Sequence, residues 1–123
     1  MTRLRESEAD FQQAVIDAAR YCGWLCSHFR PARTEKGWRT PVAADGKGFP
    51  DLVLVRDRVL FVELKTDTGK LSGDQEVWQS AIDGALDAWL RFCSTPDAFE
   101  VLPFDYLVWR PRDWTQIKEV LGG

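Results

Sequence analysis

The chain has 123 residues, 45% hydrophobic and 28% charged, which fits one globular domain over residues 1–123 and excludes a second core. Its 16 basic and 19 acidic side chains give a net charge of −3, which excludes an overall basic coat but not a local nucleic-acid surface. No apolar run approaches the ~20 residues of a membrane span, no signal-peptide segment is seen, and the cysteines lack zinc-ribbon spacing. We therefore expect a cytoplasmic protein, not secreted and with no membrane partner.

The first part of the chain predicts a helix, a strand and a long loop. Residues 6–22 repeat apolar side chains at helical spacing; Ser7 can cap the start, and Gly23 ends the pattern. Residues 24–29 read as a short strand. Residues 30–49, rich in basic, glycine and proline residues, predict a loop, and a loop of that length in a small domain is usually functional or mobile.

The second part predicts three strands and two helices. Ser72 begins the first helix, and Asp113 caps a short final helix that ends at Leu121. The prolines within 91–104 indicate irregular chain. The order α-β-β-β-α-β-α predicts an α/β (α+β) fold, a mixed sheet flanked by helices. The strands cover residues 51–55, 58–65 and 106–110, and the first two are close enough for a hairpin.

Two acids and a lysine gather at the ends of the hairpin strands. Asp51 begins one strand, while Glu63 and Lys65 lie near the end of the next and, two residues apart, share one face. Pairing of the strands brings Asp51 opposite that end. Two carboxylates suit Mg²⁺ or Mn²⁺, and a nearby lysine can orient water and stabilise charge on a phosphate. The pattern therefore predicts metal-dependent phosphodiester hydrolysis.

Glu8 and Gln75 are candidates for the same site. Glu8 precedes Phe11 by three residues on the apolar stripe, which predicts a carboxylate facing the sheet; alternatively it only favours the positive end of the helix dipole. Gln75 lies on the core stripe of its helix, but Ser72 and Gln75 also form an S-x-x-Q capping box. Both roles of the glutamine are compatible.

The basic loop is the predicted nucleic-acid surface, because it leads directly into Asp51. Arg and Lys can neutralise phosphates, and a tryptophan can stack on an unpaired base. The alternative is a solvated loop with one anchoring tryptophan. Arg110 and Arg112 are weaker candidates of the same kind. The predicted contacts are Arg30, Arg33, Lys36, Trp38, Arg39 and Lys47.

The stretch from 48 to 78 resembles the signature of the VRR-NUC family, the virus-type replication-repair nucleases of the PD-(D/E)XK superfamily. The family pattern is similar to G-x-PDL, an E-L-K strand and L-S-x-x-Q-x-x-W. An upstream E-x-x-F and a late VWRP strand at 108–111 also match, so the resemblance covers nearly the whole chain. The matching residues are Gly48, Pro50, Asp51, Leu52, Glu63, Leu64, Lys65, Leu71, Ser72, Gln75 and Trp78.

The resemblance implies a restriction-endonuclease-like core and a homodimer that cuts branched DNA. Residues 91–105 are longer than the usual link in the family, a departure that bears on the local packing and the dimer surface. The implied ion ligands are Asp51, Glu63 and the Leu64 carbonyl, with Lys65 acting on the attacking water, Glu8 completing the acidic cluster, and Gln75 as the motif glutamine.

The sequence thus predicts a Mg²⁺- or Mn²⁺-dependent endonuclease that acts on branched or flapped DNA in replication and repair. One alternative is a resolvase of four-way (Holliday) junctions. A second, from another class, is a module that binds nucleic acid without cleaving it; the complete set of Asp51, Glu63 and Lys65 argues against it.

Overall fold

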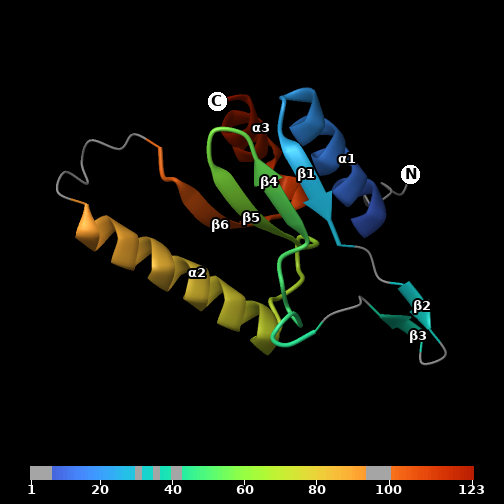
Figure 1. Cartoon of the computed structure of the whole chain (residues 1–123). Helices are drawn as coiled ribbons and strands as arrows, with labels where there is room; N and C mark the ends of the chain where they lie inside the picture. Colours follow the sequence, from blue (N-terminus) through green and yellow to red (C-terminus); the bar gives the residue numbers. More distant parts are fainter. Residues whose placement is uncertain (1–6, 30–31, 35–36, 40–42, 94–100) are drawn as a thin grey trace.

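The computed structural model describes residues 7–29, 32–34, 37–39, 43–93 and 101–123, and a four-stranded sheet lies at its centre (Figure 1). The strand order is β1-β4-β5-β6. The strands of the sheet are β1 (Leu25–His28), β4 (Leu52–Val55), β5 (Val59–Leu64) and β6 (Phe104–Trp109). The helical elements are α1 (Glu8–Tyr21), α2 (Gly73–Phe92), the 3-10 turn η2 (Pro111–Asp113) and α3 (Trp114–Gly122).

The sheet is mixed. β1 runs antiparallel to β4, and β4 antiparallel to β5, whereas β5 and β6 are parallel. Antiparallel neighbours need only a short turn, but a parallel pair needs a crossover, and the chain between β5 and β6 contains α2. The predicted α/β (α+β) fold, a mixed sheet flanked by helices, is confirmed.

One face of the sheet carries the main core, and α1 and α3 lie on that side (Figure 1). Alternation along the strands puts every second side chain on this face. Apolar residues one turn apart likewise place the apolar side of α1 against this face. Trp24, just before β1, is linked to α3, because its Nε1 donates to the Leu121 carbonyl at 2.9 Å. The core consists of Phe11, Val15, Ala19, Trp24, Leu52, Leu54, Leu60, Val62, Leu64, Trp109, Ile117 and Leu121.

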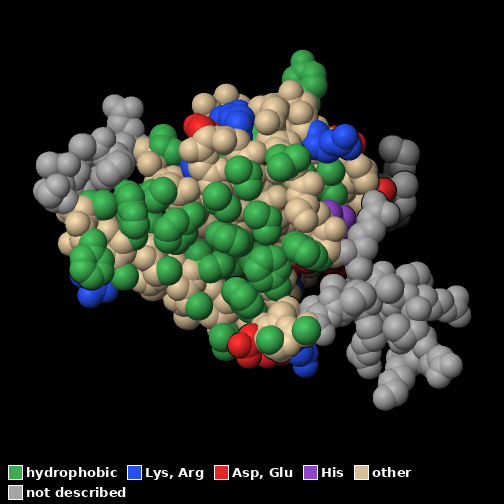
Figure 2. Space-filling view, in the orientation of Figure 1, with side chains coloured by type: hydrophobic (Ala, Val, Ile, Leu, Met, Phe, Trp, Pro, Cys, Tyr) green, Lys and Arg blue, Asp and Glu red, His purple; other side chains and the backbone are tan. Residues whose placement is uncertain are grey.

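The opposite face is covered less completely, because α2 packs along β6 and leaves the other strands more open. Leu25 is 76% exposed, and Phe29 and Val55 are also exposed. Figure 2 shows hydrophobic side chains gathered over the sheet and α2 on this side. We call the apolar residues of β1, β4 and β5 here the open sheet face; they are Leu25, Phe29, Val53, Val55, Val59 and Phe61.

The start and end of α1 follow the sequence signals. The Ser7 Oγ accepts a hydrogen bond from the Asp10 N–H at 3.0 Å, which caps the helix as expected. Gly23 then takes a φ of 87°, a left-handed conformation that favours glycine. None of the described helices combines the length and the apolar character that crossing a bilayer requires.

The prediction of a plain loop at 30–49 is wrong in part. This segment contains β2 (Ala32–Thr34) and β3 (Gly37–Arg39), which pair antiparallel as a sheet of their own. In Figure 1 this pair stands away from the main sheet. Its strands are short and polar and lack the apolar alternation by which a half-buried strand is recognised.

The role expected for Asp113 also differs. Its side chain makes no capping bond to α3; its Oδ2 accepts from the Arg110 N–H at 2.8 Å. Pro111 opens the 3-10 turn η2 just before α3, and a proline suits such a first position because its φ is already fixed. The carboxylate therefore closes the 3-10 turn instead of the α-helix.

Candidate active site

Asp51 and Glu63 meet across the β4–β5 hairpin. The register pairs Leu52 with Val62, so Asp51, immediately before β4, comes level with Glu63. The Asp51 Oδ2 accepts a hydrogen bond from the Leu64 N–H at 2.8 Å, which ties the first acid to the backbone beside the second. The sequence-based expectation that the hairpin brings the two acids together agrees with this geometry.

Glu63 is the only buried charged side chain among the described residues, with 1% exposure. Its Oε1 accepts from the Gln75 Nε2 at 3.0 Å, and the Lys65 Nζ lies 3.9 Å from the same oxygen. Its Oε2 is buried and has no hydrogen-bond partner within the described part of the chain. Because an unpaired buried carboxylate oxygen is costly, this atom is the natural point of attachment for a ligand.

Burial raises the pKa of the Glu63 carboxyl from 4.5 to about 8, and the negative charge of Asp51 adds to the effect. The Lys65 ammonium lowers this pKa but does not offset burial and the effects of the Asp51 side chain, which are larger. The protein alone therefore supplies too little positive charge to keep Glu63 fully ionised at neutral pH. A bound cation reverses that balance.

The oxygen donors at this point fit a hard divalent cation. Asp51 and Glu63 contribute carboxylate oxygens, and Mg²⁺ is commonly held by one or two carboxylates together with waters and substrate phosphate. The unpartnered Glu63 Oε2 is the observation that supports the fit. Within the described residues no group of three or more His, Cys, Asp or Glu side chains is placed to hold a metal ion.

Glu8 therefore does not join the two acids in this structure. It is the first residue of α1 and is exposed, whereas the buried stripe of the helix begins at Phe11. The expectation that its carboxylate turns toward the sheet is not met. An acid in the first turn is stabilised by the free N–H groups and the helix dipole without any inward contact.

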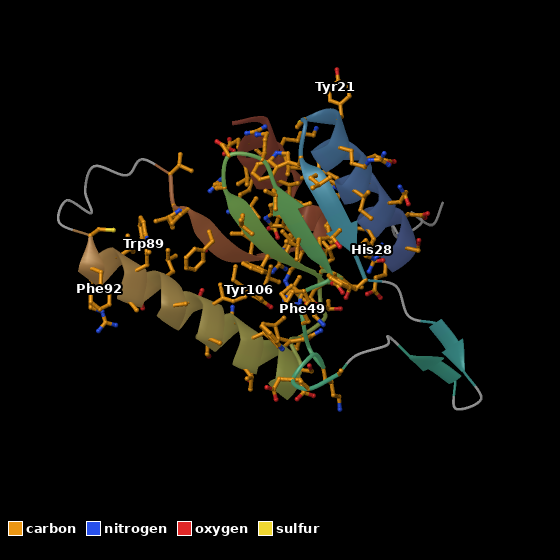
Figure 3. All side chains as sticks on the ribbon, in the orientation of Figure 1. Tyr21, His28, Phe49, Trp89, Phe92 and Tyr106 are labelled. Atoms are coloured by element: carbon orange, nitrogen blue, oxygen red, sulfur yellow. The ribbon has the colours of Figure 1, made fainter. Side chains whose placement is uncertain are left out.

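The loop that leads into β4 lies against the start of α2. Gly48 has a φ of 83°, and a Cβ atom built there would lie 2.5 Å from the Asp74 carbonyl carbon, so the backbones touch directly. The Trp78 Nε1 donates to the Asp45 carbonyl at 3.0 Å. Phe49 (labelled in Figure 3) meets the ring of Trp78 edge to face, with centroids 4.9 Å apart. These contacts fix the point at which the first catalytic candidate enters the sheet.

Gln75 makes the capping-box hydrogen bonds and also contacts one of the two acids. Its Oε1 accepts from the Ser72 N–H at 2.8 Å, and the Ser72 Oγ accepts from the Gln75 N–H at 3.3 Å, which completes the capping box of α2. Its Nε2 donates to Glu63. One side chain thus joins the start of α2 to the buried acid.

The structure describes only some of the residues that are predicted to contact nucleic acid. Arg30 and Lys36 lie outside the described residues. Lys47 is exposed and forms an ion pair with Asp74 at 3.4 Å. The β2–β3 hairpin carries Arg33, Trp38 and Arg39.

Arg110 has a role that the sequence did not reveal. We considered it a weak candidate for DNA contact, but its Nη1 donates to the Thr66 and Gly69 carbonyls at 2.6 Å each. Both carbonyls belong to the turn that follows Lys65. The sequence places Arg110 at the end of the predicted strand 106–110, and this position does not specify its partners.

The VRR-NUC domain model matches residues 25–86, about half of the chain, from β1 into α2. The matched stretch contains Asp51, Glu63, Lys65 and Gln75. Among curated proteins, no match to the chain is found. The VRR-NUC domain has a PD-(D/E)XK-like fold, in agreement with the mixed sheet and its flanking helices. By this match, the chain belongs to the VRR-NUC domain family of PD-(D/E)XK-type nucleases, for which DNA is the expected substrate.

Proposed function

We propose that the protein is a divalent-metal-dependent endonuclease that hydrolyses phosphodiester bonds in branched or flapped DNA. One observation carries the proposal: the buried Glu63 beside Asp51, with its Oε2 unpartnered in the described part of the chain. Such a carboxylate is destabilised unless a cation is bound next to it. Membership of a nuclease family supports the class of reaction, and we assign the two acids as the centre at which that reaction takes place.

Each residue of the site has a distinct role in the proposal. Asp51, Glu63 and the Leu64 carbonyl would hold Mg²⁺ or Mn²⁺. Such an ion, when bound, polarises the phosphoryl oxygen and lowers the pKa of a water. Lys65, whose side chain is only 18% exposed, orients the attacking water and stabilises charge that develops on the phosphate. Gln75 occupies one oxygen of Glu63 and leaves the other available.

The proposed DNA-binding surface is the basic segment that precedes Asp51. It includes the β2–β3 hairpin, which connects β1 to the loop leading into β4 and stands off the main sheet (Figure 1). A basic arm in this position can follow a phosphate backbone toward the site. The residues assigned to it are Arg30, Arg33, Lys36, Trp38, Arg39 and Lys47.

The open sheet face supports a homodimer as the working form. Apolar side chains that are exposed together on one face mark an interaction surface in a protein of this size. Two copies related by a two-fold axis would present two active sites to the arms of a branched duplex. This arrangement suits the processing of branched intermediates in DNA replication and repair.

Cleavage of supercoiled plasmid and of labelled flaps, forks and four-way junctions tests the proposal. With Mg²⁺ or Mn²⁺ the wild type nicks DNA, and EDTA abolishes the activity. Glu63→Ala and Lys65→Ala each lower the rate by ~10³-fold, because each removes a group that stabilises the transition state. Lys70→Ala changes it less than two-fold, since Lys70 is an exposed lysine without a place in the site.

The panel also separates the alternatives. Preferential and symmetric cutting of four-way junctions identifies a junction resolvase. Tight binding of branched DNA by pure wild-type protein, with no cleavage under any divalent metal, identifies a non-cleaving binding module and refutes the nuclease proposal.

A further inference from the structure

The chain after β5 folds back against the lysine of the proposed site. The Lys65 N–H donates to the Trp109 carbonyl at 3.0 Å, which extends the β5–β6 ladder by one residue. A turn then begins, in which the Gly69 N–H donates to the Thr66 carbonyl at 3.3 Å and to the Thr66 Oγ1 at 3.0 Å. A Cβ atom built at Gly69 would lie 3.7 Å from the Lys65 Cδ, so the turn flanks the lysine stem.

Arg110 clamps this turn. Its Nη1 donates to the Thr66 and Gly69 carbonyls at 2.6 Å each, and hydrogen bonds from a charged donor are stronger than neutral ones. The arginine backbone is itself fixed: its N–H donates to the Asp113 Oδ2, and the Asp113 N–H donates to its carbonyl, both at 2.8 Å. The guanidinium thus acts from a rigid point at the end of β6.

We infer that Arg110 is a positioning residue for Lys65: by closing the turn against the lysine stem, it keeps the ammonium at the acid pair. This inference rests on the proposed function. The ammonium lies 3.9 Å from the Glu63 Oε1, and a lysine side chain loses ~2 kcal/mol of rotamer entropy when it is held in one place. Because the turn restricts the methylene chain of Lys65, part of this entropy is lost during folding and not when substrate binds.

Arg112 provides a matched control on the same turn. Its N–H donates to the Asp67 Oδ1 at 3.1 Å and its Nη1 to the Asp67 carbonyl at 3.2 Å. It makes neither of the two bonds of Arg110, and it is exposed. A general loosening of the turn is therefore expected from both arginine substitutions, whereas the effect on Lys65 is expected from Arg110 alone.

The test is steady-state cleavage of the best branched substrate by Arg110→Ala, Arg110→Lys and Arg112→Ala. Arg110→Ala lowers kcat by 10- to 100-fold with KM unchanged within two-fold, since misplacement of a catalytic group costs rate in this range. Arg110→Lys recovers most of the rate, and Arg112→Ala stays within two-fold of wild type. Lys65→Ala combined with Arg110→Ala is no slower than Lys65→Ala alone.

Three kinetic results overturn the inference: a raised KM at unchanged kcat, which indicates a DNA contact; a loss of rate in Arg112→Ala equal to that in Arg110→Ala; or a double variant slower than Lys65→Ala. A readout that needs no nuclease activity separates this failure from that of the proposed function. Under trace acetic anhydride, Lys65 of Arg110→Ala is acetylated at least three-fold faster than in wild type, with Lys118 unchanged. An unchanged Lys65 rate refutes the positioning role, even if wild type cleaves no substrate. If Arg110→Ala fails to fold, Arg110→Gln replaces it in both measurements.

Discussion

Glu63 sits where the folded protein does not stabilise its charge. It is fully buried, its nearest acid is Asp51, and the Lys65 ammonium is 3.9 Å away. A hydrophobic residue of similar volume would serve the core better. Under the proposed function a bound cation accounts for this position, and without the cation an ionised Glu63 lowers the stability of the fold.

The first prediction concerns stability against pH in EDTA. The folded pKa of Glu63, about 8, is raised above its ordinary 4.5, so the contribution of Glu63 to the unfolding free energy is largest below pH 4.5 and is lost as pH rises through 8. Glu63→Gln removes this dependence and is more stable than wild type at pH 8 by ~3 kcal/mol. Denaturant titrations at pH 5 and pH 8 measure it. The exposed Glu119→Gln is the control, and an equal pH slope in Glu63→Gln contradicts the account.

A second prediction concerns Gly48, whose positive φ and contact with Asp74 leave no room for a side chain. Gly48→Ala costs ~2 kcal/mol or more, from the left-handed backbone together with the steric overlap. Gly84→Ala is the matched control: beyond the adjacent backbone of α2, no atom of the described residues lies within 4 Å of a Cβ built there, and alanine in a helix interior is favoured by ~0.5–1 kcal/mol. Melting temperatures that fall in both variants, or in neither, contradict this prediction.

At the scale of elements, local signals predicted most of the architecture. Periodicity and caps gave α1 and α2, and the short spacing of two apolar runs gave the β4–β5 hairpin that carries the acid pair. The pairing of β2 with β3 was missed because its strands lack apolar alternation. Contacts between distant segments, such as those of Arg110 with the turn after β5, have no local pattern and were not predictable. The inward orientation expected for Glu8 failed for a related reason, since periodicity does not say where a buried stripe begins.

The third prediction separates the two functions of the capping box. Ser72→Ala removes the bond to the Gln75 N–H and costs ~1 kcal/mol, with little change in cleavage. Gln75→Glu keeps an acceptor for the Ser72 N–H but replaces the Nε2 donor with an oxygen facing Glu63. We expect a rate lower by ~10-fold or more, together with a lower melting temperature, because the new carboxyl lies against a buried acid. Equal rates in Gln75→Glu and wild type would show that the bond to Glu63 has no part in catalysis.

At the scale of the whole molecule, the two faces of the sheet have different surroundings. One is closed by α1 and α3 over the core, and the other keeps the open sheet face between β1 and the region covered by α2. Leu25 and Val55 are neighbours in the β1–β4 register, and both side chains are exposed. A partner that covers this face removes exposed apolar surface from water.

The fourth prediction follows from that face. Wild type sediments as a dimer at micromolar concentration, and Leu25→Lys combined with Val55→Lys gives a folded monomer, because two charges would be buried in the interface. Tyr21→Lys stays dimeric: Tyr21 is 93% exposed, but it is the last residue of α1, the helix that covers the opposite face of the sheet, and it points outward (Figure 3). Sedimentation velocity measures the three proteins. A dimer that survives the double substitution would place the interface elsewhere.

The hydrogen bonds of the acid pair have a consequence for how the site is filled. The Asp51 Oδ2 is used by the Leu64 N–H, and the Glu63 Oε1 by Gln75, so each acid has a single oxygen outside these bonds. Under the proposed function, a Mg²⁺ ion held by these oxygens and the Leu64 carbonyl would complete its coordination shell with water and a phosphate oxygen. Ion and nucleic acid would then bind cooperatively, each raising the affinity of the protein for the other by the same factor.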